Sequence, residues 1–402
     1  MSQDEASTFE PPSFLVGELR ERALAVARGL AATASERDRQ GGTARLERDA
    51  IRRSGLLAAS IDKALGGDGA SWPEILDIVR SWARVDGSLA HLFGFQHLLL
   101  ATVRLFGTRE QWEPLHRETV EKRWFWGNAL NPLDESTTLV EKTPGHFVLH
   151  GTKSFSSGSV DADRLIVSAI DESTRRLVVA VLPPDRSGLR VVGDWDNFGQ
   201  RQTDSGSVVF SDVQVREDDL LRRPGPLGST FASLRPLLAQ AILANVYLGI
   251  AEGAFLEGRR HTASRKTAWF KSNVTSAAQD PYVLHRFGDL FVAVESARVL
   301  ADRAAATLGA AFARGDELTT EERGRAAIHV ASAKVATTRA ALGVTNEIFE
   351  ATGARSTAAR FNFDRFWRNA RTHTLHDPVD YKLRELGEFA LLHELPQPTF
   401  YS

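Results

Sequence analysis

The stretch RNARTHTLHDPVDYK, residues 368–382, holds the side chains best suited to proton chemistry in this sequence. His373 and His376 stand three positions apart, directly before Asp377, in a chain with 11 histidines. A neutral imidazole donates and accepts hydrogen bonds and exchanges a proton near neutral pH, whereas an ionised carboxylate only accepts. His376 therefore suits a reaction at an oxygen-derived group, or it merely stabilises the end of the preceding helix, where positive charge is favourable. We assign His373 to that helix end, where the macrodipole and solvent account for it.

A second candidate is the turn GTKSFSSGS, residues 151–159, between two expected strands. Ser156 and Ser157 supply hydroxyls, and the turn predicts exposed backbone N–H groups suited to the edge of a flat heterocycle or to an oxyanion. Ser and Gly are also usual in any hairpin turn, so both interpretations stay open. His91 and Phe95 in SLAHLFGFQHLLL are four residues apart and share a helix face, where a lone histidine is often a core residue.

Several kinds of chemistry are excluded by residue type. The chain has no Cys and one Met, which leaves no disulfide, thiolate nucleophile or thiolate metal site. His373 and His376 lack a third ligand, so we expect no metal site. No GxGxxG follows a strand, so no dedicated NAD domain is expected. The scarcity of sulfur fits either sulfur economy or protection from a bound oxidant.

Charge and hydropathy limit the partners. Lys and Arg number 49 against 51 Asp and Glu, a net charge of -2, which predicts no nucleic-acid binding. We find no apolar run near the roughly 20 residues that span a bilayer, and the N-terminus is acidic and polar. We therefore expect no membrane association and a cytoplasmic protein.

The distribution of residue types along the chain predicts the helices and strands that position these residues. Residues 15–119 are helix-like, with Ser71 predicted as a helix cap beside Pro73. Residues 124–221 contain short β-rich runs separated by turns, which predicts a mainly antiparallel domain. Apolar stripes stepping by 3 and 4 over 287–308 and 328–349 predict two long helices of a bundle. We expect domains at 1–120, 121–223 and 224–402.

This order resembles the acyl-CoA dehydrogenase architecture, an α+β fold with an N-terminal helical domain, a central antiparallel β-domain and a C-terminal four-helix bundle. The resemblance is carried by FGQRQTDSGSVVFSDVQV, residues 198–215, and DRFWRNARTHTLHDP, residues 364–378. In that family the loop after the second stretch commonly carries a Glu that removes an α-proton. Here His376 stands at that place.

The chain is most similar to the flavin monooxygenases built on this fold, in the branch of dibenzothiophene monooxygenase and the sulfur-acquisition oxidoreductases. The resemblance implies a two-component enzyme, using reduced FMN and O2 through a C4a-(hydro)peroxyflavin to oxygenate a small apolar substrate, above all an organosulfur compound. It further implies a separate NAD(P)H:flavin reductase and a homotetramer. FMN is favoured over FAD because FEATGARS does not match the adenine-side Gln-x-x-Gly-Gly pattern.

The resemblance also implies roles for individual residues. His376, Ser157 and His91 would be catalytic, with Ser157 near flavin N5. The flavin-binding set would be Phe95, Asn128, Ala129, Leu130, Asn131, Pro132, Leu133, Ser156, Ser157, Trp195, Arg265, Ala354, Arg355 and His376, with a lid just beyond Leu133. Arg265 would reach the flavin phosphate across a subunit boundary. Phe95 replaces a Tyr of related desulfurising enzymes, which puts an identical substrate in doubt.

Three alternatives stay open. The chain could oxygenate an amine nitrogen, an indole or an aromatic carbon with the same cofactor. It could be a genuine FAD-dependent acyl-CoA dehydrogenase whose base lies elsewhere. It could also be a helical scaffold protein that binds no flavin.

Overall fold

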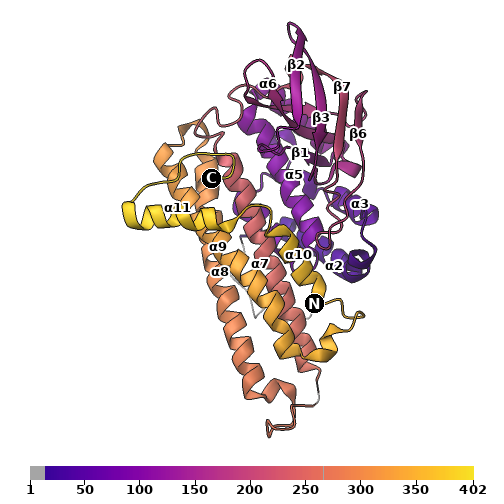
Figure 1. The fold of residues 1–402 in the computed structure, drawn as a ribbon, viewed down its shortest axis with the longest axis vertical. Coiled ribbons are helices and arrows are strands. Elements are labelled where there is room, and N and C mark those ends of the chain that lie inside the picture. The colour runs from indigo at the N-terminus through magenta and orange to yellow at the C-terminus, as the bar shows by residue number, and fades with distance from the viewer. Residues whose placement is uncertain (1–13, 266) are drawn as a thin grey trace.

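The computed structural model describes residues 14–265 and 267–402. The chain starts with the helices α2 (Gly17–Gln40), α3 (Arg45–Ser54), α4 (Trp72–Ala83), α5 (Gly87–Phe106) and α6 (Arg109–Lys122), with short 3-10 turns at Leu56–Ala58 and Lys63–Leu65. As predicted, Ser71 caps α4, and its capping box is completed by Glu74. Figure 1 shows α5 below the sheet and beside the long C-terminal helices, with α2 and α3 on its outer side.

A mixed sheet follows the first helices. Its strands are β1 (Trp126–Ala129), β2 (Thr137–Thr143), β3 (His146–Lys153), β4 (Arg164–Asp171), β5 (Leu177–Leu182), β6 (Leu189–Val191) and β7 (Val208–Arg216). The order is β1-β4-β2-β3-β7-β6, and β5 pairs with β4. The pairings are mainly antiparallel, as predicted, but β1 and β2 each pair with β4 in parallel.

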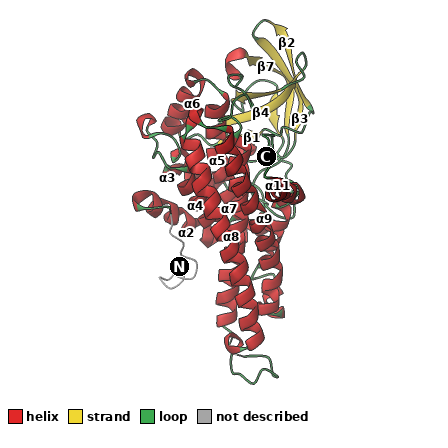
Figure 2. Ribbon diagram, turned by 90° about the vertical axis from the view of Figure 1, so that its left-hand side faces the viewer, coloured by secondary structure: helices red, strands yellow, loops and turns green. Residues whose placement is uncertain are grey.

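Long helices return after the sheet. They are α7 (Leu234–Ala263), α8 (Pro281–Ala313) and α9 (Thr320–Thr352), followed by the shorter α10 (Asp364–His373) and α11 (Val379–Leu392). Figures 1 and 2 show α7, α8 and α9 side by side along the length of the molecule, and α10 packs on α7 and α9. The predicted stripe of α8 is buried at Leu290, Val294, Ala297, Ala301, Ala304 and Leu308. The expected order of helices, strands and helices is therefore confirmed.

Two helices correct our expectation about apolar runs. By length and composition α5 and α7 could each cross a membrane, so the expectation that no apolar run is long enough was wrong. In both helices 94% of the most apolar window is buried inside the protein. They are therefore core helices, and Trp82, Leu98, Ile242 and Val294 belong to one core that joins the N-terminal and C-terminal helical regions.

The helix α5 is the element around which the other parts meet. It contacts α7, β1 and α10, so it lies where both helical regions adjoin the sheet. The inner residues of the sheet form a second core, which includes Phe147, Leu165 and Phe210.

Candidate active site

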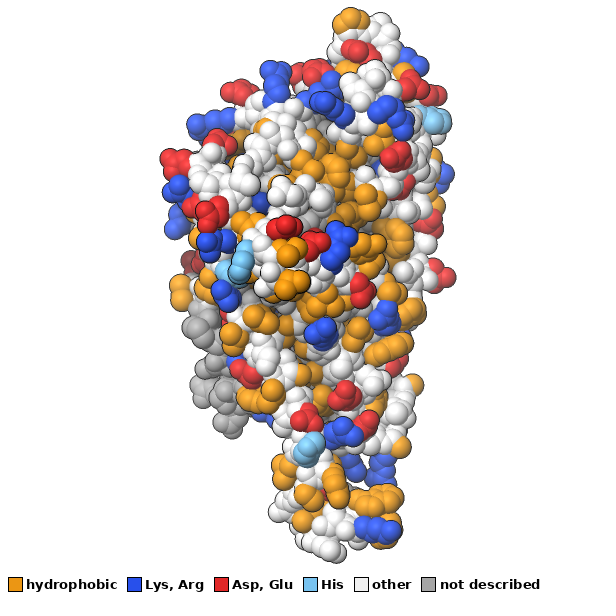
Figure 3. Space-filling model, turned by 60° about the vertical axis from the view of Figure 1, so that its left-hand side comes forward, with side chains coloured by type: hydrophobic (Ala, Val, Ile, Leu, Met, Phe, Trp, Pro, Cys, Tyr) orange, Lys and Arg blue, Asp and Glu red, His pale blue; other side chains and the backbone are white. Residues whose placement is uncertain are grey.

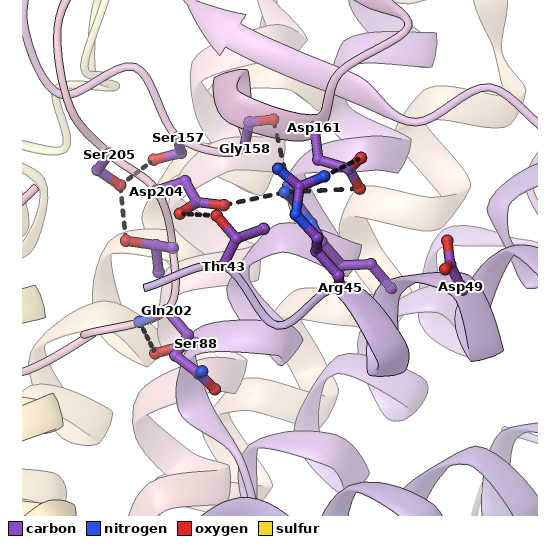
Figure 4. Close-up of polar contacts among 12 residues, drawn as sticks. Thr43, Arg45, Asp49, Ser88, Ser157, Gly158, Asp161, Gln202, Asp204 and Ser205 are labelled. Atoms are coloured by element: carbon purple, nitrogen blue, oxygen red, sulfur yellow. Dashed lines mark hydrogen bonds and ion pairs between the residues drawn. The ribbon is translucent and has the colours of Figure 1, made fainter. Parts of the chain in front are cut away.

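A chain of polar side chains links α5 to two loops of the β-region. His91 Nε2 lies 3.0 Å from Ser157 Oγ, which lies 2.8 Å from Ser205 Oγ. Ser205 Oγ is 2.7 Å from Thr203 Oγ1, and Thr203 Oγ1 donates to Gln200 O over 3.0 Å. Figure 4 shows the contacts of Ser205 with Ser157 and with its neighbour. His91 and Ser157, chosen from the sequence, are thus in direct contact, whereas no sequence signal identified Ser205 or Thr203.

The turn of Ser157 differs from the expected exposed turn. Ser156 and Ser157 are buried, and their backbone N–H groups donate to Gly206 O and Phe155 O. The N–H of Gly158 donates to Thr203 O over 2.8 Å. The prediction of exposed backbone donors was wrong, because the loop of residues 203–206 packs directly on this turn. The polar group of Ser157 that contacts His91 is therefore its side-chain hydroxyl.

A buried ion pair holds the same two loops from the N-terminal side (Figure 4). The guanidinium of Arg48 on α3 is fully buried, donates to Asp204 Oδ2 over 2.9 Å and reaches Gly158 O over 3.2 Å. Thr43 Oγ1 donates to the other oxygen of Asp204 over 2.9 Å. Because one planar guanidinium bonds both loops, it fixes the spacing of Ser157 and Ser205.

His373 is the main correction to the sequence interpretation. Its side chain is buried rather than in solvent, and its ring lies 4.6 Å from the ring of His91. The Tyr247 hydroxyl donates to His373 O over 2.8 Å. Burial lowers the pKa of His373 well below its usual value, and burial, with a smaller contribution from His376, lowers the pKa of His91 to about 3. Both rings are therefore neutral at pH 7.

His376 lies in the loop after α10 and is partly exposed. Its Nδ1 lies 2.9 Å from Asp377 Oδ1, an oxygen that also accepts from Lys334 Nζ over 3.0 Å. Burial by itself would raise the pKa of Asp377, but the bond from His376 and the charge of Lys334 hold that pKa well below its usual range. The ionised carboxylate directs His376 Nδ1–H, so Nε2 is the nitrogen free to exchange a proton.

The residues expected along the flavin edge occupy β1 and the loop after it. Asn128 is buried, and its backbone N–H donates to Ser157 O over 2.8 Å. Its side-chain Oδ1 is buried and has no hydrogen-bond partner among the residues that the structure describes. Ala129 and Leu130 are buried too, Asn131 and Pro132 are half-buried, and Leu133 is exposed. On α5, the ring of Phe95 lies 4.1 Å from that of His91.

The remaining predicted residues lie apart from this cluster or at its border. Trp195 is half-buried, and its Nε1 donates to Gln200 O over 2.8 Å. Arg265 donates to Ala351 O and Thr352 O, beside the exposed Ala354 and Arg355. This group lies where α7 and α9 end, the lower end of the bundle in Figure 1, whereas the sheet is at the top. Within one chain, Arg265 and Arg355 are therefore remote from Ser157.

Models of the acyl-CoA dehydrogenase family match three parts of the chain: the N-terminal domain over residues 18–119, the middle domain over 130–213 and the C-terminal domain over 241–381. A probable FMNH2-dependent monooxygenase of Pseudomonas putida, SfnC, is 53% identical over 385 residues, which cover 94% of this chain and 97% of SfnC.

Two solved structures share the fold at high identity. The methanesulfinate monooxygenase MsuC of Pseudomonas fluorescens superposes with a TM-score of 0.94 at 53% identity, over 96% of this chain and all of MsuC, 100%. The dibenzothiophene monooxygenase TdsC of Paenibacillus sp. A11-2 has a TM-score of 0.89 at 42% identity, over 96% of this chain and 99% of TdsC. TdsC has also been solved with FMN bound.

Proposed function

The chain belongs to the FMNH2-dependent monooxygenases with the acyl-CoA dehydrogenase fold, and we propose that it oxygenates the sulfur atom of a small organosulfur compound beside His91, Ser157 and His376. The observation that carries this proposal is the buried contact between His91 Nε2 and Ser157 Oγ. The backbone N–H of Asn128 donates to Ser157 O, and Asn128 Oδ1 is buried without a partner among the described residues. Buried polar atoms are nearly always paired, so Asn128 Oδ1 is an acceptor that a bound molecule could satisfy.

The residues at this place suit FMN. Asn128 Oδ1 and Ser157 Oγ offer acceptors to the N–H groups of a flavin ring, and the aromatic ring of Phe95 offers an apolar wall. Bound reduced FMN supplies the electrons that activate O2. Because the enzyme depends on FMNH2, a flavin reductase must provide it.

We assign the proton chemistry to His376. Its Nδ1–H is held by Asp377, and the partly exposed ring can exchange protons with solvent at Nε2. His91 is buried and neutral, so it orients the Ser157 hydroxyl rather than serving as an acid. The ionised Asp377 is already engaged by His376 and Lys334, which disfavours a dehydrogenase reaction with Asp377 as the base.

We propose further that the enzyme acts as a homotetramer in which Arg265 and Arg355 complete the flavin site of a neighbouring subunit. Their distance from Ser157 within one chain supports this arrangement. Large apolar side chains are exposed on α8 and α11, among them Tyr282, Val292, Val299, Leu391 and Leu392. Figure 3 shows hydrophobic side chains between charged ones down this side of the molecule, as an interface requires.

A substrate panel tests the function. Methanesulfinate, dibenzothiophene and indole are incubated separately with the protein, O2, FMN and an NADH:flavin reductase, and the products are read by mass. Addition of oxygen to a sulfur compound, dependent on reduced FMN, supports the proposal. Oxygenation of indole alone would favour a carbon oxygenase. Anaerobic bleaching of a tightly bound FAD by an acyl-CoA would establish the dehydrogenase instead.

A further inference from the structure

The hydroxyls of Ser157, Ser205 and Thr203 form a row of hydrogen bonds that ends at a backbone carbonyl, Gln200 O. This end fixes the direction in which each hydroxyl donates its proton. Thr203 Oγ1 is 3.0 Å from Gln200 O, which can only accept. Each hydroxyl has a single proton, so Thr203 donates to Gln200, Ser205 donates to Thr203, and Ser157 donates to Ser205. His91 Nε2 must then donate its proton to Ser157 Oγ.

The opposite direction makes fewer bonds. If Ser157 donated to His91 Nε2, the imidazole proton would move to Nδ1, which is buried and has no partner within residues 14–265 and 267–402. The bond from Thr203 to Gln200 O would also be lost. A buried N–H without an acceptor is rarer in folded proteins than a buried lone pair without a donor. The direction from His91 toward Gln200 is therefore the stable one, and burial, which lowers the pKa of His91 to about 3, leaves this ring a single proton at pH 7.

This direction leaves Ser157 with nothing to donate to a ligand. Its proton points to Ser205, and one of its two lone pairs receives the proton of His91. The other lone pair remains for a ligand. On the strand whose backbone bonds Ser157 O, Asn128 Oδ1 is an acceptor without a partner among the described residues, while Asn128 Nδ2 is directed to Leu130 O. Ser157 Oγ thus presents an acceptor only.

We propose that Ser205 and Thr203 act through Ser157 to make the site select reduced FMN over oxidised FMN. Reduction of a flavin adds an N–H at N5, where the oxidised ring has only a lone pair. An acceptor-only Ser157 can bond that N–H and gives the oxidised ring no donor. This inference rests on the proposed FMN-dependent function, and it explains how such an enzyme captures reduced flavin and releases the oxidised form after turnover.

Binding of the two flavin states tests the inference. Dissociation constants for oxidised FMN in air and for reduced FMN under anaerobic conditions are measured for the wild-type protein and for Ser205→Ala. Without Ser205 Oγ, the Ser157 proton is free to bond oxidised flavin. The dissociation constant for oxidised FMN divided by that for reduced FMN should therefore fall about fivefold, which is the effect of one neutral hydrogen bond. Ser205→Thr retains the hydroxyl and should retain the ratio.

Thr203 provides an independent pair of variants. Thr203→Val removes the hydroxyl that anchors the chain to Gln200 O, and it should lower the ratio in the same direction as Ser205→Ala. Thr203→Ser should leave it unchanged. If Ser205→Ala fails to fold, this pair still decides the question.

A flavin-free measurement reads the proton direction itself. In the protein without FMN, ¹⁵N NMR of labelled histidine should show the Nε2–H tautomer for His91, with the signal assigned by its loss in His91→Gln. The Nδ1–H tautomer, or a ratio of dissociation constants that is the same in all variants, would overturn the inference while leaving the proposed function intact. Failure of the wild-type protein to bind FMN or to oxygenate any substrate would instead overturn the function.

Discussion

Lys334 Nζ lies 3.0 Å from Asp377 Oδ1, and both side chains are buried, with 1% and 9% of their surface exposed. The same carboxylate oxygen accepts from His376 Nδ1 over 2.9 Å. Lys334 also donates to Gln240 Oε1 over 2.7 Å. A charge on α9, held by α7, therefore orients a histidine in the loop after α10, and the ion pair has both a structural and a positioning role.

Asp377→Asn should destabilise the protein by about 3 kcal/mol or more, because it leaves the Lys334 ammonium buried without a countercharge. Urea unfolding followed by circular dichroism measures this change. Asp380→Asn is the matched control, since Asp380 is exposed three residues further along and should stay within about 0.5 kcal/mol of the wild type. Equal stability of the two variants would show that Lys334 does not need the charge of Asp377.

His376→Ala should keep the fold and uncouple the reaction. The Lys334–Asp377 pair persists without the imidazole, but the group that exchanges protons at Nε2 is missing. Loss of a positioned acid or base typically costs 10²- to 10⁴-fold, so we expect product formation to fall by about 10²-fold or more while NADH oxidation now yields hydrogen peroxide. Product and peroxide are quantified in the same assay. His393→Ala, at an exposed histidine after α11, should remain coupled, and normal coupling in His376→Ala would remove its assigned role.

The fold was predictable from local patterns, and part of the site was not. The stripe of α8, most of the stripe of α9 and the cap of α4 depend on periodicity and on neighbouring residues, which the sequence displays. The short strand β1 pairs in parallel with β4, a contact between distant segments that no local pattern reveals. His376, Ser157 and His91 were selected through residue type and family resemblance, and their roles stay predictions.

His373 and Ser205 show why the rest was missed. The end of α10 looks solvent-exposed by its sequence, but α10 packs on α7 and α5, so His373 is buried against His91 and Tyr247. Ser205 lies in a loop after Asp204, whose positive φ of 47° turns the chain toward Ser157. His373 is buried by segments that lie more than a hundred residues away in the sequence. Ser205 is placed by the backbone geometry at Asp204.

The buried histidines should make the protein sensitive to acid. Burial lowers the pKa of His91 and of His97 to about 3, from 6.5. Between these two pKa values the unfolded chain binds more protons than the folded chain. The free energy of unfolding therefore decreases as pH falls below about 6.5, by about 1.4 kcal/mol per pH unit for each histidine. Above that pH the contribution of these histidines to stability is fully retained. Urea unfolding between pH 7.5 and 5 measures this slope. His97→Gln should reduce it by the share of one histidine, and an unchanged slope would contradict the assignment of His97 as a neutral buried group.

Subunit association should depend on the exposed apolar face of α8. Val299→Arg places a charge where 65% of the valine surface is exposed in the single chain, and a charge at the core of an interface is strongly disfavoured. Light scattering after size exclusion should show smaller assemblies than for the wild type. Leu46→Arg, on α3 with 79% exposure, is the control that should leave the mass unchanged. A tetramer that survives Val299→Arg would place the interface elsewhere.

Complementation between two inactive variants should reveal a site shared by subunits. Ser157→Ala and Arg265→Ala, each expressed alone, should have little activity, because every site lacks one of the two groups. When the two chains are coexpressed, a site formed by Ser157 of one chain and Arg265 of its neighbour is intact, and random pairing predicts activity in about a quarter of the sites. Coexpression of Ser157→Ala with His376→Ala is the control. His376 follows His373, whose ring lies 4.6 Å from that of His91 in the same chain, and His91 contacts Ser157, so these groups belong to one chain and no site is restored. Recovery in the first mixture alone indicates that Arg265 serves the neighbouring subunit, and absence of recovery in both would assign Arg265 to a role within its own chain, where it already binds Ala351 O and Thr352 O.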